Sequence, residues 1–391
     1  MRRPPLLLVL SLVACGQRAP ANTAGGPTGV DGAPTPAKKD PRIVQMALGG
    51  RHSVLLRADG RVLTFGENNY GQLGDTSGDR SVAKLVPNLE DVVQVAAGDF
   101  FTCVRLKKGT VACFGANASG QLGDGTKTKR ATPVVIEGLA DAAEISLGDL
   151  HGCARVDNGL RCWGYNDHGQ LGDGTRTHRQ KPVAVLDLPD VDRVSLGGTH
   201  TCARGVDKKL YCWGKSDKGQ VGDGDNEDQL KPTTPRDLGE VAEVSAGDKH
   251  TCVRLLDDTV KCFGNNSHGE LGDGTKVNRG TPTSPNNLGK VAQIAAGDAH
   301  TCARLHDATV TCWGASDYGQ VGDGERKNRL EPVKVEGLGH VQQLALGWSH
   351  TCVLRDDATV WCWGANSKGQ LGNGATKLET RPTPILVLPD P

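Results

Sequence analysis

Short hydrophobic runs alternate with polar turns along nearly the whole chain from residue 43 onward. A representative stretch, residues 291–316, reads VAQIAAGDAHTCARLHDATVTCWGAS. Runs of five or six residues, separated by Gly, Asp and Asn turn signals, predict short β-strands and not helices. A proline-led run such as EPVKVEGL, residues 331–338, follows in the same unit. We therefore predict four strands in each unit.

The unit recurs seven times. The phrase Gly-Gln-Leu-Gly-Asp, with Glu, Val or Asn as occasional replacements, starts at Gly71, Gly120, Gly169, Gly219, Gly269, Gly319 and Gly369. One small sheet cannot cover both of its faces, so neighbouring units must pack face to face. The repeats predict an all-β fold, a seven-bladed β-propeller with four strands per blade. A solenoid is the alternative, but seven near-equal repeats without a polar cap favour a closed ring.

The sequence divides into three parts. Residues 1–14 are predicted to be a lipoprotein signal peptide, residues 15–41 a flexible tether rich in Pro, Gly and Ala, and residues 42–391 the propeller. The predicted repeats span about 43–91, 92–141, 142–190, 191–240, 241–290, 291–340 and 341–390.

The first residues have the charge order of a secretory signal. Arg2 and Arg3 precede an apolar run at residues 6–13, which is too short to span a bilayer. Residues 12–15, Leu-Val-Ala-Cys, resemble the bacterial lipobox, which implies cleavage before Cys15 and lipidation of that cysteine. An ordinary signal with an incidental cysteine is the alternative. Gly16 after the cysteine would favour the outer membrane.

The repeat motifs carry a family resemblance. The pattern Gly-x-x-His-(Ser/Thr), then xWGxN, then xxGQLGxG, at a period of about fifty residues, resembles the regulator of chromosome condensation repeat. The resemblance implies a seven-bladed propeller. Kelch repeats share the period, but their diglycine pattern is not found here.

Twelve cysteines form six pairs, each flanking the turn between the two middle strands of a repeat. The pairs are Cys103 and Cys113, Cys153 and Cys162, Cys202 and Cys212, Cys252 and Cys262, Cys302 and Cys312, and Cys352 and Cys362. A hairpin places such residues opposite each other, within reach of a disulfide. The first repeat carries Val54 and Thr64 instead, so both cysteines are missing together. We predict six disulfides; zinc is disfavoured, because it needs four ligands.

Other repeated residues are predicted to be structural. Ring symmetry spreads equivalent positions around an axis, so we interpret the repeated histidines as hydrogen-bonding groups and the repeated Trp and Phe as an apolar slot between blades. The histidines are His52, His151, His200, His250, His300 and His350, with Phe101 in the second repeat. The aromatic positions are Trp163, Trp213, Trp313 and Trp363, exchanged for Phe65, Phe114 and Phe263. The asparagines Asn68, Asn117, Asn166, Asn266 and Asn366, or Ser216 and Ser316, are predicted to hold turns.

The residues just before the histidine differ between repeats. Arg51, Phe100, Leu150 and Trp348 fall there in four neighbouring blades, numbers one, two, three and seven. Trp and Arg are enriched in binding hot spots, so we predict that these four residues form one arc that binds a partner. The alternative is that they fold back over the end of the core.

Two sets of charged loops follow the Gly-Asp-Gly phrase. Basic loops start at Thr126, Thr175, Thr275 and Glu325; they could bind an anionic ligand, but a solvated rim is the favoured interpretation. The acidic loop at residues 223–228 lacks the ligand spacing of a calcium loop.

The net charge and the absence of catalytic motifs reduce the number of functions that fit the sequence. Lys plus Arg equals Asp plus Glu at 45 each, so no long-range field gathers nucleic acid. The sequence shows no catalytic motif, and we predict no enzyme activity, no cofactor and no metal. The predicted function is a monomeric, lipid-anchored scaffold in the cell envelope, at the outer membrane or cell surface. It would bind a protein or an envelope polymer through one propeller face and touch the membrane only through its anchor.

The resemblance supplies two rival functions. Some secreted propellers of this family inhibit β-lactamases, which implies an enzyme inhibitor or effector that uses the same face. Guanine-nucleotide exchange, the activity of the nuclear member, is disfavoured, because the repeats leave no insertion for a wedge and the signal directs the chain away from a GTPase. The ultraviolet-sensing plant relatives use several GWxHT sequences, whereas this chain has one, at residues 347–351.

Overall fold

The computed structural model describes residues 40–387. The predicted signal peptide, the predicted lipidation site at Cys15 and all of the predicted tether before residue 40 lie outside this range. Residues 40–387 contain 28 strands and no helix. No helix in this range could therefore serve as a membrane span.

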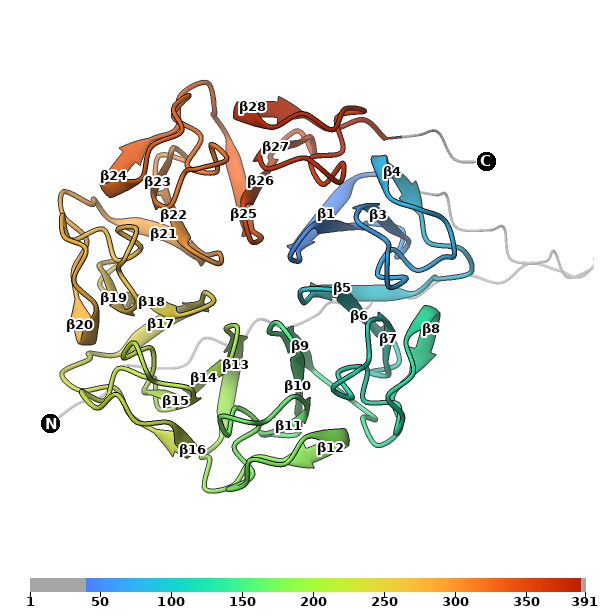
Figure 1. The fold of residues 1–391 in the computed structure, drawn as a ribbon, viewed down its shortest axis with the longest axis horizontal. Coiled ribbons are helices and arrows are strands. Elements are labelled where there is room, and N and C mark those ends of the chain that lie inside the picture. Colours follow the sequence, from blue (N-terminus) through green and yellow to red (C-terminus); the bar gives the residue numbers. More distant parts are fainter. Residues whose placement is uncertain (1–39, 388–391) are drawn as a thin grey trace, which may run out of the picture. The chain divides into compact units, whose positions relative to one another are not determined.

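The strands form seven antiparallel sheets, and each sheet consists of four strands that are consecutive in the sequence. Figure 1 shows the sheets arranged around a ring, with the first strand of each sheet innermost and the fourth outermost. The seven-bladed propeller with four strands per blade is confirmed.

The strands of blades one to three are β1 (Ile43–Leu48), β2 (His52–Arg57), β3 (Val62–Gly66), β4 (Arg80–Leu85), β5 (Val92–Ala97), β6 (Phe101–Leu106), β7 (Val111–Gly115), β8 (Arg130–Val135), β9 (Glu144–Leu147), β10 (His151–Val156), β11 (Gly159–Gly164) and β12 (Arg179–Ala184). Those of blades four and five are β13 (Val191–Leu196), β14 (His200–Gly205), β15 (Leu210–Gly214), β16 (Gln229–Thr233), β17 (Val241–Ala246), β18 (His250–Leu255), β19 (Val260–Gly264) and β20 (Arg279–Thr283). Those of blades six and seven are β21 (Val291–Ala296), β22 (His300–Leu305), β23 (Val310–Gly314), β24 (Arg329–Lys334), β25 (Val341–Leu346), β26 (His350–Arg355), β27 (Val360–Gly364) and β28 (Glu379–Pro384).

The ring closes without any exchange of strands between blades. Gly374 N of blade seven donates a hydrogen bond of 2.8 Å to Ser81 O of blade one. Gly324 N of blade six makes the equivalent bond of 3.0 Å to Thr380 O of blade seven. Ala83 in β4 additionally forms a parallel bridge with Val387. The closing contact is therefore the same contact that joins other neighbouring blades, with one bridge added.

The core lies between the blades. The repeated Trp and Phe side chains are among the largest fully buried groups, as the slot interpretation predicted. Trp163 of blade three packs with Cys103 and Phe101 of blade two in one apolar cluster. Each blade thus covers the face that its neighbour leaves open, and no single blade has a complete core.

Candidate functional site

The six predicted disulfides are present on the middle hairpins of blades two to seven. Every pair is directly opposed across its ladder, with Cα atoms 4.1 Å apart and both sulfurs buried. In blade one, Val54 lies opposite Thr64. The Thr64 hydroxyl donates to Leu73 O at 2.8 Å and accepts from the Arg80 guanidinium at 2.6 Å. In the blade without a disulfide, these hydrogen bonds tie Thr64 to the following loop and to Arg80 of β4, whereas its partner position holds the apolar Val54.

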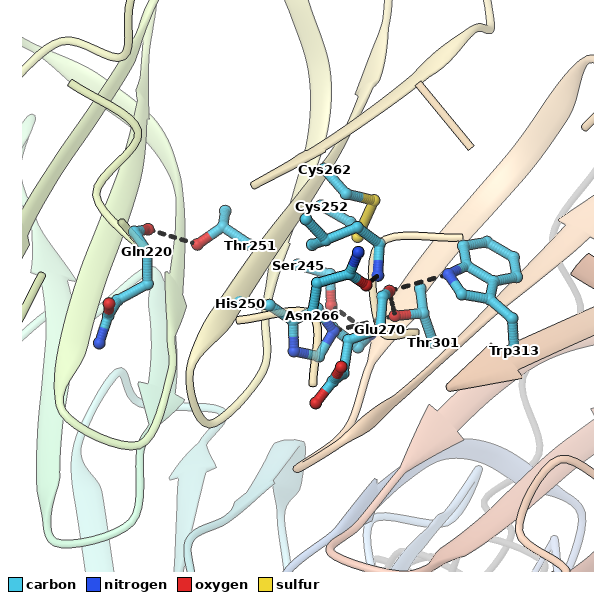
Figure 2. The surroundings of a disulfide bond; sticks show 12 residues. Gln220, Ser245, His250, Thr251, Cys252, Cys262, Asn266, Glu270, Thr301 and Trp313 are labelled. Carbon is cyan, nitrogen blue, oxygen red and sulfur yellow. Dashed lines mark hydrogen bonds between the residues drawn. A yellow bond between two sulfur atoms is a disulfide. The ribbon is translucent and has the colours of Figure 1, made fainter. Parts of the chain in front are cut away.

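The repeated histidines form a hydrogen-bonded ladder between blades. Each Nε2 lies 2.8 to 3.1 Å from a hydroxyl oxygen of the next blade. The pairs are His52–Thr102, His151–Thr201, His200–Thr251, His250–Thr301, His300–Thr351 and His350–Ser53. Figure 2 shows the network around the Cys252–Cys262 disulfide, where Thr301 and Trp313 both donate to Glu270 O.

The direction of these hydrogen bonds and the burial of the rings determine the tautomer and the charge of the histidines. Because the Thr301 hydroxyl donates to a carbonyl, its oxygen accepts from His250, so we assign the proton of His250 to Nε2. Burial lowers the pKa of His52 and His300 to about 3, so these rings are neutral at physiological pH. The structural interpretation of the histidines is confirmed, and residues 40–387 contain no His, Cys, Asp and Glu cluster that could hold a metal ion.

One interface lacks the ladder bond. Blade two carries Phe101 in place of the histidine, and blade three carries Gly152 in place of the hydroxyl residue. Donor and acceptor are thus both absent between these two blades. Phe101 is fully buried and fills the slot with apolar surface.

The loops after the third strands are held by their own polar residues. Asn266 Nδ2 donates to Asp273 Oδ1 at 2.9 Å, and its Oδ1 accepts from Leu271 N at 3.0 Å. Arg279 lies 2.9 Å from the same Asp273. Equivalent ion pairs are Arg130–Asp124, Arg179–Asp173 and Arg329–Asp323. The arginines of the basic loops are therefore used within the loops, which favours the interpretation of these loops as a solvated rim.

Four side chains from blades one, two and seven meet on the end face of the ring that carries these loops. We call this group, Arg51, Tyr70, Phe100 and Trp348, the aromatic cluster. The Phe100 and Trp348 ring centroids are 5.4 Å apart at 87°, and those of Tyr70 and Phe100 are 5.3 Å apart. Arg51 Cζ lies 5.6 Å from the Trp348 ring centroid. The edge-to-face and cation–π geometries are those that aromatic and guanidinium groups prefer.

The structure brings three of the four predicted arc residues into this cluster. Leu150 lies one turn further along the ring and is half-buried. Gly50 makes room for the indole, because a Cβ there would lie 3.0 Å from Trp348 Cε2. Sequence reasoning missed Tyr70, although the signal was present. The residue before each Gly-Gln-Leu-Gly phrase also differs between repeats, as Ser119, His168, Lys218, His268, Tyr318 and Lys368.

A small cavity opens on the ring axis beside the cluster. Its lining includes the same turn position from all seven blades: Gly50, Asp99, Asp149, Gly198, Asp248, Asp298 and Trp348. We call this the channel mouth; its volume is about 90 Å³. The carboxylates of Asp149 and Asp248 approach each other over Gly198, because a Cβ there would clash with Asp248 Oδ1 and lie 2.8 Å from Asp149 Oδ2. Four carboxyl groups from four blades thus share one cavity.

Burial changes the acidity of these carboxyl groups. Burial, together with the charge of Asp248, raises the pKa of Asp99 to about 7 and that of Asp298 to about 7. Burial also raises the pKa of Asp149 well above its usual range, with added repulsion from Asp99 and Asp248. Lys249 Nζ lies 3.1 Å from Asp248, whose charge raises the pKa of this lysine. The channel mouth therefore holds fewer charges at neutral pH than its four carboxyl groups suggest.

Sequence reasoning did not identify the channel mouth. The Gly-Asp phrase looks like an ordinary turn in each repeat, and only closure of the ring brings the carboxyl groups together. A wider groove of about 730 Å³ adjoins the mouth at Asp248 and Asp298. It is also lined by Lys218, Lys249, His268 and Lys276.

Seven contiguous four-stranded blades around a closed ring define this chain as a seven-bladed β-propeller. Residues 9–236 match the RCC1-like domain, and the Regulator of chromosome condensation (RCC1) repeat is matched at residues 241–270, 291–320 and 341–370. The chain belongs to the RCC1-like domain family. The resemblance seen in the repeat motifs is thereby confirmed.

Known relatives share the fold at low sequence identity. Yeast RCC1 (Prp20), solved bound to Kap60, is 19% identical with a TM-score of 0.76, and 84% of each chain is covered. Human WBSCR16 is 22% identical with a TM-score of 0.74, covering 80% of this chain and 86% of that one. The RCC1 domain-containing protein RUG3 of Arabidopsis thaliana is 46% identical over 44 residues, 11% of this chain and 10% of that protein.

Proposed function

We propose that this propeller is a non-enzymatic scaffold that binds a protein partner through the end face carrying the aromatic cluster. The cluster is the observation that carries the proposal. Arg51 is exposed and Tyr70 is 43% exposed, while Phe100 and Trp348 are half-buried beside them. Trp, Tyr and Arg dominate binding hot spots, because they bury large areas and keep a polar group for orientation.

The neighbouring propellers support a protein partner over an envelope polymer. Yeast Prp20p was solved bound to Kap60, and a second structure of it was described with binding to Gsp1p and histones. Those partners belong to the yeast protein. They indicate that this fold presents surfaces suited to proteins.

The proposal includes a location in the cell envelope, with a lipid anchor at Cys15. The six buried disulfides support this location, because such bonds persist in oxidising compartments. The signal-like sequence and the lipobox resemblance support the anchor.

The size of the channel mouth supports binding over catalysis. Convergent carboxyl groups with raised pKa values are also what acid–base enzymes use, so the mouth is a place where an enzymatic function would be sought. Its volume of about 90 Å³ is far below the roughly 300–1,000 Å³ of pockets that take small-molecule substrates. The six histidines are fully buried between blades and cannot reach a substrate.

Crosslinking in intact cells, followed by identification of captured proteins, tests the proposal. Trp348→Ala is the test variant and Trp361→Ala is its matched control. Trp361 also has a guanidinium over its ring, that of Arg355 at 5.6 Å. Trp361 lies in β27, opposite Val353 of β26, and not in the turn before β26 that holds Trp348. We expect Trp348→Ala to lose at least about tenfold of the captured partner, as hot-spot residues do, and Trp361→Ala to retain it.

Two results would contradict the proposal. One is full retention of every partner by both Trp348→Ala and Phe100→Ala. The other is an equal loss for the Trp361 control, because that result would indicate a general effect on folding. Melting curves of all three variants establish that each is folded.

A further inference from the structure

The channel mouth and the aromatic cluster form one continuous surface. Trp348 belongs to both, because its ring packs against Phe100 and its side chain also lines the cavity. Trp348 also hydrogen-bonds with the carboxyl group of Asp99 on the cavity side. A partner that packs on the cluster therefore extends directly over the mouth.

The charges of the mouth have no adequate counter-charge within the protein. The residues that line it include Asp99, Asp149, Asp248 and Asp298. Among the described residues, its lining contains no Lys, Arg or His. Lys249 forms an ion pair with Asp248 at 3.1 Å from the rim, and its charge also acts on Asp298. Burial raises the pKa of the other three carboxyl groups, which disfavours their charged forms. A cation placed beside them would lower these pKa values and favour ionisation.

The neighbouring groove is a poorer place for a cation. Lys218, Lys249 and Lys276 line it together with Asp248 and Asp298. Asp99 and Asp149 line only the mouth, whereas Asp248 and Asp298 line both hollows and lie beside the lysines of the groove. Charge complementarity therefore assigns a positive group to the mouth.

The size of the mouth limits what can enter. The mouth, at about 90 Å³, is much smaller than the adjoining groove of about 730 Å³. The head group of one long side chain fits that space, whereas a whole folded segment does not. The flanking Phe100 and Trp348 rings can cover the apolar stem of such a side chain.

We infer that the channel mouth receives the basic head group of one lysine or arginine of the partner protein, while an adjacent apolar residue of that partner packs on the aromatic cluster. The inference rests on the proposed binding function and specifies its chemistry. The carboxylates would hold the head group by charge-assisted hydrogen bonds, which are stronger than neutral ones. The aromatic cluster would supply the buried apolar area.

Synthetic octapeptides provide the test. Each probe holds one leucine and one variable residue, which is Arg, Lys, Gln or Glu, at spacings of one to four positions. Binding to the full chain is measured by fluorescence anisotropy. At one or more spacings we expect the Arg or Lys peptide to bind about tenfold more tightly than its Gln counterpart, with a preference that falls as ionic strength rises.

The variants Asp99→Asn and Asp149→Asn, alone and together, remove the charge while keeping the side-chain shape. We expect them to abolish the preference for Arg or Lys. Asp307→Asn is the matched control, because Asp307 is an exposed residue of the turn between β22 and β23, at the other end of its blade. That variant should retain the full preference.

An Arg or Lys peptide that binds no better than its Gln counterpart at every spacing, or that does not bind, overturns the inference. So does a preference that survives in the Asp99→Asn/Asp149→Asn variant. These results are separable from failure of the proposed function. If the Asp variants capture partners normally in cells while Trp348→Ala does not, the binding face stands and the role of the mouth is wrong.

Discussion

Equivalent positions in the interior of the blades carry the same residues and bonds, whereas equivalent positions on the end face carry different residues. Inside, the same ladder bond joins His200 to Thr251 and His300 to Thr351, and the same buried disulfide recurs in six blades. On the end face, the equivalent turn positions hold groups as different as Gly50, Asp149 and Trp348. Repetition therefore marks the scaffold, and departures from repetition mark the surface on which this propeller differs from a generic ring.

The interior should be the more sensitive region to reduction. Each disulfide closes a loop of about ten residues, for which chain-entropy arguments give about 2–3 kcal/mol. Six such bridges together give roughly 12–18 kcal/mol, which is comparable to or larger than the roughly 5–15 kcal/mol by which a typical domain is stable. We expect the reduced protein to lose its cooperative thermal transition, as followed by circular dichroism. An unchanged transition with all six bridges opened would contradict this expectation.

Low pH should have the next largest effect on the free energy of unfolding, through the histidines buried between the blades. Burial lowers the folded-state pKa of His52, His151, His300 and His350 to about 3, from 6.5. Below pH 6.5 the unfolded chain takes up protons that the folded chain does not, so this stability is present above pH 6.5 and is lost as the pH falls toward 3. We expect the free energy of unfolding, from urea titrations, to fall by up to about 5–6 kcal/mol for each pH unit below 6.5, at about 1.4 kcal/mol per unit for each of the four groups.

The end face should show a smaller pH effect of opposite sign. The folded-state pKa values of Asp99 and Asp298 are raised to about 7, so the folded chain holds protons that the unfolded chain releases above pH 4. Their stabilising contribution is full below pH 4 and is lost as the pH rises to 7. The Asp99→Asn/Asp298→Asn variant should therefore be more stable than the wild type at pH 8, by about 1–3 kcal/mol, and similar to it at pH 4.

The same urea titrations check this expectation. A variant that is less stable than the wild type at pH 8 would show that the ionised carboxyl groups stabilise the mouth. Asp307→Asn, in an exposed turn, serves as the control and should change the pH profile little.

The two regions also differ in how far the sequence predicted them. The blades, the six disulfides and a hydrogen-bonding role for the repeated histidines follow from short-range pattern and a fixed period, which are visible along the chain. The Thr partners of these histidines, which lie in the next blade, were not predicted. Asp99, Asp149 and Tyr70 acquire their roles from residues in other blades. Asp149 meets Asp248 only because a closed ring brings alternate turns to one axis over Gly198. The lipidation of Cys15 remains a sequence prediction.

Site-specific photo-crosslinking at Tyr70 tests the central claim most directly. Tyr318 occupies the equivalent loop position in blade six and is similarly exposed, at 48% against 43%, but it lies away from the aromatic cluster. With p-benzoylphenylalanine placed at either position in intact cells, the binding face predicts a strong protein crosslink from position 70 and a weak one from position 318. Equal crosslinking at the two positions, or a crosslink from position 318 alone, would contradict the assignment of the aromatic cluster as the binding centre.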